Sequence, residues 1–152
     1  MHRGFLASYN AVRDIIPDVQ SLTLKYPNKR VFCTGHSLGG AIAQLVALEL
    51  RSLGMNASIY TFGSPRVGNK NFADYFNNAI KGDNFRITYS NDPVPTVPPN
   101  SLGFYHTGTQ VHYTSLARYS VLPIYYDYSP SWKFNVFDHS NYKYILQYDI
   151  LA

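Results

Sequence analysis

Apolar side chains recur at spacings of three and four residues between positions 4 and 26, with polar residues between them. This periodicity predicts an amphipathic helix, and Pro17 inside it predicts a kink or a break. The next apolar segment, residues 30–35, is short and rich in β-prone side chains, which favours a buried strand. An Ala- and Leu-rich stretch from Leu38 to about Leu53 then predicts a second helix, with Gly54 as its C-cap.

The alternation of strand-like and helix-like segments continues beyond this point. Residues 57–62 and 84–90 predict two further strands, with a helix over Phe72–Ile80 between them. Strand, helix, strand, helix and strand is typical of a parallel sheet covered by helices. The pattern then predicts a weaker strand, a loop and a final helix, over residues 109–114, 121–131 and 139–148. We therefore expect a small α/β domain with a short, mostly parallel sheet flanked by helices.

Length and composition restrict the class of protein further. The 152 residues match the usual size of one domain, so a single domain is expected over residues 1–152. A hydrophobic content of 45% with only 14% charged residues excludes a disordered chain. The net charge of +4, with no basic run longer than Lys29-Arg30, argues against a nucleic-acid partner.

Other function classes are excluded by what the sequence does not contain. No stretch approaches the roughly 20 apolar residues of a transmembrane helix, and the apolar run at the N-terminus is too short for a secretory signal. The single cysteine, Cys33, excludes an intrachain disulfide and a cysteine-based zinc site. The five histidines lack His-x-x-x-His spacing, so neither a metal nor a cofactor is expected.

One motif carries chemistry. Residues 35–39 read Gly-His-Ser-Leu-Gly, a Gly-x-Ser-x-Gly pattern placed after a predicted strand and before a predicted helix. A sharp turn there would expose the Ser37 hydroxyl, with Gly35 and Gly39 avoiding collisions between strand and helix. The Leu38 N–H at the helix start would stabilise an oxyanion on an attacked carbonyl. A glycine-rich turn that merely caps a helix is the alternative interpretation.

A serine hydroxyl needs a base, and the base needs an acid that holds its tautomer. In hydrolases with this turn the chain order is serine, acid, histidine. Asp92 directly follows the strand at 84–90, whereas Asp74 and Asp83 lie on a helix and at its end. His139 precedes the last predicted helix and is the preferred base, with His106 as the second candidate.

These segments resemble the fungal-type class 3 triacylglycerol lipases. The similarity covers His2-Arg3-Gly4-Phe5, Val31–Ala41, Tyr60–Asn69, Asn91–Pro95, Gly103–His106 and Asp138-His139 with Tyr142. The resemblance implies an α/β-hydrolase fold with Ser37, Asp92 and His139 as catalytic triad and the Leu38 N–H as oxyanion donor. It also implies that Pro65, Val94 and Val97 line an acyl-binding groove.

The same resemblance implies an ester or lipid substrate, met at a lipid–water interface, and secretion by analogy. Family members have additional chain before the equivalent of His2, which supplies early strands, a lid and a second oxyanion donor. Relative to them, the sheet is expected to be truncated at the N-terminus. Three functions remain open: a triacylglycerol lipase, a feruloyl-type or short-chain esterase, and a catalytically weak domain that binds lipid or protein.

Overall fold

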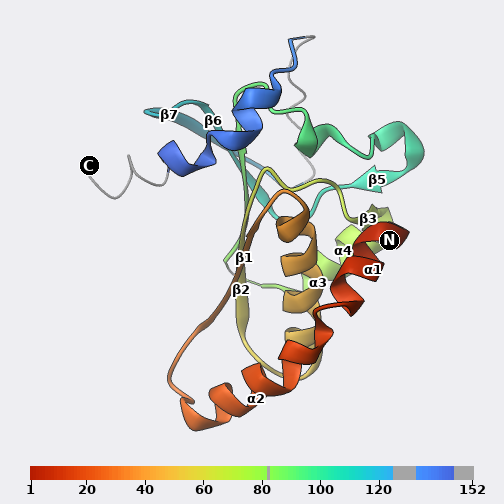
Figure 1. Cartoon of the computed structure of the whole chain (residues 1–152), viewed down its shortest axis with the longest axis vertical. Coiled ribbons are helices and arrows are strands. Elements are labelled where there is room, and N and C mark those ends of the chain that lie inside the picture. The colour runs from red at the N-terminus through yellow and green to blue at the C-terminus, as the bar shows by residue number, and fades with distance from the viewer. Residues whose placement is uncertain (82, 125–132, 146–152) are drawn as a thin grey trace.

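The computed structural model describes residues 1–81, 83–124 and 133–145 (Figure 1). Its centre is a five-stranded sheet in the order β1-β2-β4-β6-β7. The first four strands of that order are parallel, and β7 is antiparallel to β6. The strands of the sheet are β1 (Val31–His36), β2 (Ala57–Phe62), β4 (Asn84–Tyr89), β6 (Thr109–Ser115) and β7 (Arg118–Leu122). The expected α/β domain with a mostly parallel sheet is therefore confirmed.

The helices α1 (Arg3–Asn10), α3 (Leu38–Ser52) and α4 (Lys70–Ala79) lie on one side of this sheet (Figure 1). The helix α2 (Ile16–Lys25) lies at the lower end of the sheet in the same view. The main core lies between these helices and strands β1 and β2, and it contains the fully buried Ala41, Ala47 and Phe76. A second, smaller core on the other face is formed by Tyr142 and Ile145 against aromatic residues of the sheet.

Short elements connect the longer strands and helices of this framework. The strands β3 (Gly68–Asn69) and β5 (Phe104–Tyr105) form a separate antiparallel pair. Four 3-10 turns are η1 (Arg13–Ile15), η2 (Val94–Thr96), η3 (Asn100–Leu102) and η4 (Val136–Ser140).

The first helical segment breaks at a different place from the one predicted. The break lies at residues 11–15, where η1 separates α1 from α2, and Pro17 stands in the first turn of α2. A proline in the first turn costs little because its missing N–H would have no intrahelical acceptor there. The proline therefore marks the start of α2 rather than a kink inside it.

Two expectations near the C-terminus are corrected. The predicted loop at 121–131 overlaps β7, which pairs Tyr119 with Tyr113. This strand was missed because it is mostly exposed, so it lacks the alternation that burial of one face produces. The first two residues of the predicted helix at 139–148 belong to η4, and α-helical residues begin at 142. Residues 125–131 and 146–148 of these two predictions lie outside the described residues.

Phe76 and Tyr75, adjacent on α4, provide a matched test of the main core. Phe76 is 0% exposed and Tyr75 is 61% exposed. Phe76→Ala is expected to lower the free energy of unfolding by about 3–5 kcal/mol, because a cavity remains where the ring was. Tyr75→Ala should change it by less than about 1 kcal/mol. Urea denaturation followed by circular dichroism measures both, and equal losses would contradict this assignment of the core.

A buried histidine predicts how the stability of the fold depends on pH. Burial, with a contribution from the Arg86 guanidinium, lowers the pKa of His112 from 6.5 to about 4. Below pH 6.5 this histidine therefore binds more protons in the unfolded chain than in the folded chain. The free energy of unfolding falls for this reason as the pH drops from about 6.5 towards 4. At pH 5 the decrease that His112 causes is about 2 kcal/mol.

His112→Asn is expected to remove this part of the pH dependence. The measurement compares the free energy of unfolding of both proteins at pH 7 and pH 5. The wild type should lose more stability than the variant over this interval, and an identical loss in both would show that His112 does not contribute.

Candidate active site

The backbone at Ser37 reverses from strand to helix within a single residue. Ser37 has φ 57° and ψ −127°, and it stands between the end of β1 and the start of α3. Its N–H donates to the Phe62 carbonyl of β2 over 2.9 Å, which fixes the turn against the neighbouring strand. Its side chain forms no cap hydrogen bond with α3. The hydroxyl is therefore not engaged by the helix that it precedes.

Close packing of β1 and α3 explains two of the glycines around this turn. A Cβ atom at Gly35 would lie 2.3 Å from the Gly39 carbonyl carbon, and one at Gly40 would lie 2.8 Å from the Ser64 Cβ. A Cβ at Gly39 would meet no atom within 4 Å. The expectation that Gly39 prevents a collision is therefore wrong: Gly40 has that role, because it is the position of the helix that faces Gly35 and Ser64.

Asp92 lies just beyond the carboxyl end of β4, as the sequence predicts. It is 3% exposed, and its carboxylate accepts three hydrogen bonds. Its Oδ1 accepts from the Val94 N–H at 2.9 Å. Its Oδ2 accepts from the Tyr142 hydroxyl at 2.5 Å and from His139 Nδ1 at 2.9 Å. These donors stabilise the ionised carboxylate in a buried position.

His139, on η4, is brought to this carboxylate from 47 residues away in the chain. Its side chain is 19% exposed. Its carbonyl lies 2.7 Å from Nε2 of His36, and the two imidazole rings have centroids 4.4 Å apart. Because His36 directly precedes Ser37, this contact places the His139 segment beside the turn. An Nδ1–H that donates to Asp92 leaves Nε2 of His139 as the basic nitrogen.

Tyr142 contacts the candidate acid, Asp92, and the sequence analysis assigned it no role of its own. Burial raises the pKa of its hydroxyl, and the Asp92 carboxylate raises it further, so the group stays a donor across the physiological pH range. Its oxygen also accepts from the Tyr89 N–H at 3.1 Å. The position three residues after His139, on the same side of a helical turn, is the sequence signal that could have indicated it.

The sequence analysis also gave no role to Gly63, which lies beside Asp92 and Tyr142. It has φ 56°, and a Cβ there would lie 2.9 Å from both Asp92 Oδ2 and the Tyr142 ring. Only glycine therefore lets Asp92 and Tyr142 meet beside the end of β2. Its place directly after a predicted strand was the available signal.

The Leu38 N–H is the first of α3. The first N–H groups of a helix have no intrahelical acceptor, and they carry the positive end of the helix dipole. The structure thus places this candidate oxyanion donor on the residue that directly follows Ser37, at the start of α3.

A second residue near this edge of the sheet has an unusual backbone conformation. Among the described residues, Ser37 and Ser90 are the two non-glycine residues with a positive φ, and the φ of Ser90 is 44°.

The predicted groove residues lie on two neighbouring loops. Pro65 is buried, Val94 is half-buried and Val97 is 48% exposed. The Arg66 N–H donates to the Val97 carbonyl at 2.9 Å, which joins the two loops. The Arg66 guanidinium also donates to the carbonyls of Thr96 and Pro98. Binding of an acyl chain by these three residues stays a prediction.

The weaker candidates have structural roles. His106 is buried, its Nε2 lies 2.7 Å from the Pro95 carbonyl, and burial lowers its pKa well below 6.5. Asp74 pairs with Lys70, and Asp83 pairs with Arg30. Among the described residues, no group of three or more side chains suited to holding a metal ion is found.

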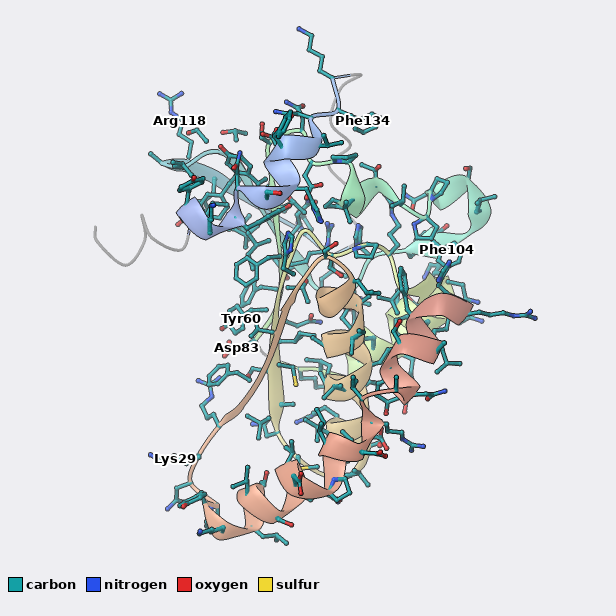
Figure 2. The ribbon with its side chains drawn as sticks, viewed as in Figure 1. Lys29, Tyr60, Asp83, Phe104, Arg118 and Phe134 are labelled. Carbon is teal, nitrogen blue, oxygen red and sulfur yellow. The ribbon has the colours of Figure 1, made fainter. Side chains whose placement is uncertain are left out.

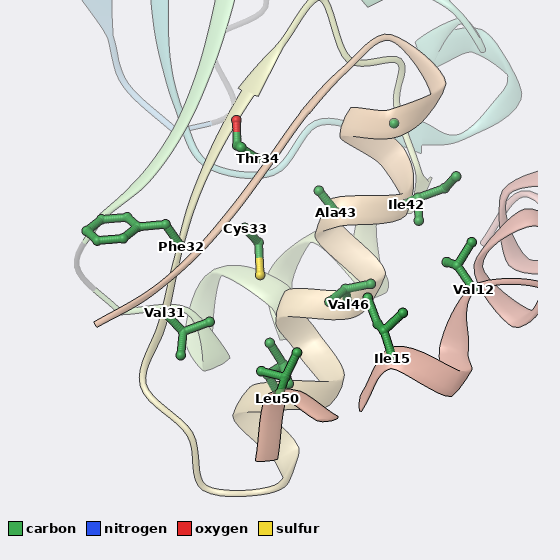
Figure 3. Close-up of a pocket in the computed structure, with 12 residues that line it drawn as sticks. Val12, Ile15, Val31, Phe32, Cys33, Thr34, Ile42, Ala43, Val46 and Leu50 are labelled. Atoms are coloured by element: carbon green, nitrogen blue, oxygen red, sulfur yellow. The ribbon is translucent and has the colours of Figure 1, made fainter. Parts of the chain in front are cut away.

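The close-up in Figure 3 shows a pocket of about 340 Å³ between β1, α3 and the corner that joins α1 to α2. It is lined mainly by apolar side chains and contains neither Ser37 nor His139. Cys33 faces α3 within it, and burial raises the pKa of its thiol to about 11. A protonated, buried thiol is a poor nucleophile, so this pocket does not compete with the Ser37 site.

Comparison with known proteins places this chain in a family. Residues 1–102 match the family described as "Lipase (class 3)". The secreted mono- and diacylglycerol lipase A of Penicillium cyclopium is 42% identical over 114 residues, covering 74% of this chain and 37% of that protein. The chain belongs to the class 3 lipase family.

Solved structures support the same assignment. Lipase II from Rhizopus niveus superposes with a TM-score of 0.83 at 35% identity, covering 91% of this chain and 56% of that one. A triacylglycerol lipase whose catalytic centre is described as a serine protease triad superposes with a TM-score of 0.81 at 36% identity, covering 91% and 57%. The fold is that of the α/β-hydrolases. The chain spans about one third to just over one half of these proteins' lengths.

Alanine substitutions at two glycines test the packing at the turn. Gly35→Ala forces a Cβ into the backbone of α3, so we expect a loss of about 2 kcal/mol or more in the free energy of unfolding. Gly39→Ala meets open space on a helix and should be neutral or slightly stabilising, by up to about 1 kcal/mol. Thermal and urea unfolding measure both. A Gly39→Ala loss as large as that of Gly35→Ala would contradict the distinction.

Proposed function

We propose that the protein is a serine carboxylic-ester hydrolase, with triacylglycerols and related acylglycerols as the first substrate class. Ser37 is the nucleophile, His139 the general base and acid, and Asp92 the carboxylate that orients His139. The observation that carries the proposal is the 2.9 Å contact between His139 Nδ1 and Asp92 Oδ2, formed beside the strand-to-helix turn at which the half-buried Ser37 stands.

In the proposed reaction, His139 Nε2 takes the proton of the Ser37 hydroxyl as Oγ attacks the ester carbonyl. Asp92 holds the Nδ1–H tautomer and stabilises the imidazolium that forms. The Leu38 N–H donates to the oxyanion of the tetrahedral intermediate. His139 then returns the proton to the leaving alcohol, and an acyl-enzyme remains. Water, deprotonated by His139, hydrolyses this ester and restores Ser37.

An apolar surface next to this site favours a lipid substrate presented at a lipid–water interface. On η4 and just before it, Phe134, Val136 and Phe137 are 57%, 66% and 76% exposed. Figure 2 shows Phe134 at the same end of the molecule as η4. Leu38 and Val97 are also exposed. Large apolar side chains gathered around one site are typical of a surface that contacts lipid or another protein.

Secretion is part of the proposal, because the Penicillium relative is described as a secreted lipase. Among the described residues, no helix is long and apolar enough to cross a membrane. Cys33 is the single cysteine, so the chain forms no internal disulfide.

Hydrolysis of a p-nitrophenyl ester series from acetate to palmitate tests the proposal. Ser37→Ala should lower kcat/KM by about 10⁵-fold or more, because the nucleophile is removed. Labelling of the wild type by a fluorophosphonate should be stoichiometric and absent from the variant. Ser52→Ala, an exposed serine at the far end of α3, is the matched control and should keep full activity.

The acyl-chain profile distinguishes the substrate classes. Rates that rise towards palmitate support a lipase, and rates that peak at acetate or butyrate support a short-chain esterase. Preference for methyl ferulate over alkyl esters would identify a feruloyl-type esterase. A folded wild type that binds lipid vesicles but shows neither turnover nor labelling would contradict ester hydrolysis and favour a lipid-binding domain.

A further inference from the structure

The acid and the base of the site are carried on two segments that are distant in sequence and held together by a second buried carboxylate. Asp138, next to His139, is 7% exposed. Its Oδ2 accepts from the Asn91 N–H at 3.0 Å, and Asn91 directly precedes Asp92. The Asn91 carbonyl in turn accepts from the Asn135 N–H at 3.0 Å. Two hydrogen bonds thus join Asn91, the residue next to the acid, to the segment that carries the base.

Asn135 completes the cluster from the start of η4. Its Oδ1 accepts from the Phe137 N–H at 3.1 Å, which leaves its amide nitrogen directed at Asp138. That nitrogen donates to Asp138 Oδ1 at 3.1 Å. Each carboxylate oxygen of Asp138 therefore has a donor, one from each segment, and the side-chain conformation of Asn135 is fixed by the helical turn that it caps.

We propose that Asp138 and Asn135 are positioning residues that hold His139 in register with Asp92. The inference rests on the proposed function, because it assigns His139 and Asp92 as base and acid. The Asp138 carboxylate acts through neighbouring groups: it fixes the Asn91 backbone on one side and η4 on the other. Catalysis depends steeply on such geometry, since a displacement of about 1 Å can cost about 100-fold in rate.

The chain offers a substitution pair that separates geometry from charge. In Asp138→Asn, the new amide oxygen accepts from the Asn91 N–H, but the new NH₂ group faces the NH₂ group of Asn135. The two NH₂ groups then repel each other, and the hydrogen bond between positions 135 and 138 is lost. Adding Asn135→Asp restores every hydrogen bond: one oxygen at position 135 accepts from the Phe137 N–H, and the other accepts from the amide at position 138. The double variant keeps the net charge and exchanges only the positions of acid and amide.

Ester hydrolysis by the whole chain gives the first readout. Asp138→Asn is expected to lower kcat about 10- to 100-fold with KM within about twofold, since substrate contacts are untouched. The double variant should recover kcat to within about threefold of wild type. Asp18→Asn, an exposed carboxylate on α2, is the control for loss of one negative charge and should have wild-type activity. If Asp138→Asn fails to fold, recovery in the double variant carries the test.

A second readout does not require turnover. In the Ser37→Ala background, proton NMR follows the downfield Nδ1–H resonance of His139 bound to Asp92. It should be present in that background, broadened or lost on adding Asp138→Asn, and regained with Asn135→Asp. If the wild type hydrolyses no ester, the proposed function fails while this resonance still reports on the positioning.

Two results would overturn the inference. Unchanged kcat and an unchanged resonance in Asp138→Asn would show that the Asn91 contact is dispensable. A folded double variant that stays as impaired as Asp138→Asn would show that the charge at position 138, rather than the hydrogen-bond geometry, is what matters.

Discussion

The reversal of the backbone at Ser37 depends on how closely β1 and α3 approach each other. Gly35 and Gly40 leave no Cβ atoms where the strand, the helix and Ser64 meet, so the helix can begin immediately after the strand. The Ser37 N–H is bonded to the Phe62 carbonyl, and the turn is therefore fixed to the end of β2. The next residue, Gly63, provides the space in which Asp92 and Tyr142 meet. One close approach of backbones thus determines where the serine, the acid and the tyrosine stand.

The histidine is held in a different way. Parallel strands that end at one edge of a sheet bring the serine turn and Asp92 together, but η4 belongs to no strand. Its position comes from polar contacts: His36 with the His139 carbonyl, Asp92 with the imidazole, and Asp138 with the Asn91 backbone. The apolar side chains of the same turn, Phe137 among them, remain at the surface. Hydrogen bonds that involve side chains therefore hold η4 in position, whereas hydrophobic packing holds the helices on the other face of the sheet.

Local sequence signals were sufficient to predict most of the fold and to select the candidates for the proposed triad. Strands β1, β2 and β4 are short β-prone runs, and Asp92 could be preferred to Asp74 and Asp83 because it follows a strand. The sequence signals failed for residues whose role depends on contacts between distant parts of the chain. Which glycine of α3 faces Gly35 and Ser64 depends on how the helix is rotated, so Gly39 was misinterpreted. The partnership of Tyr142 with Asp92 spans 50 residues, and no pattern along the chain specifies it. Strand β7 is mostly exposed and carries no alternation.

Both non-glycine residues with a positive φ among the described residues, Ser37 and Ser90, stand at the ends of strands beside this site. A conformation of this kind costs about 1–3 kcal/mol for a residue with a Cβ, and glycine relieves most of that cost. Selection for heat resistance alone would therefore favour glycine at both positions. At position 37 the same change would delete the hydroxyl on which the proposed chemistry depends. At position 37, selection for stability thus favours glycine, whereas selection for the proposed activity requires serine.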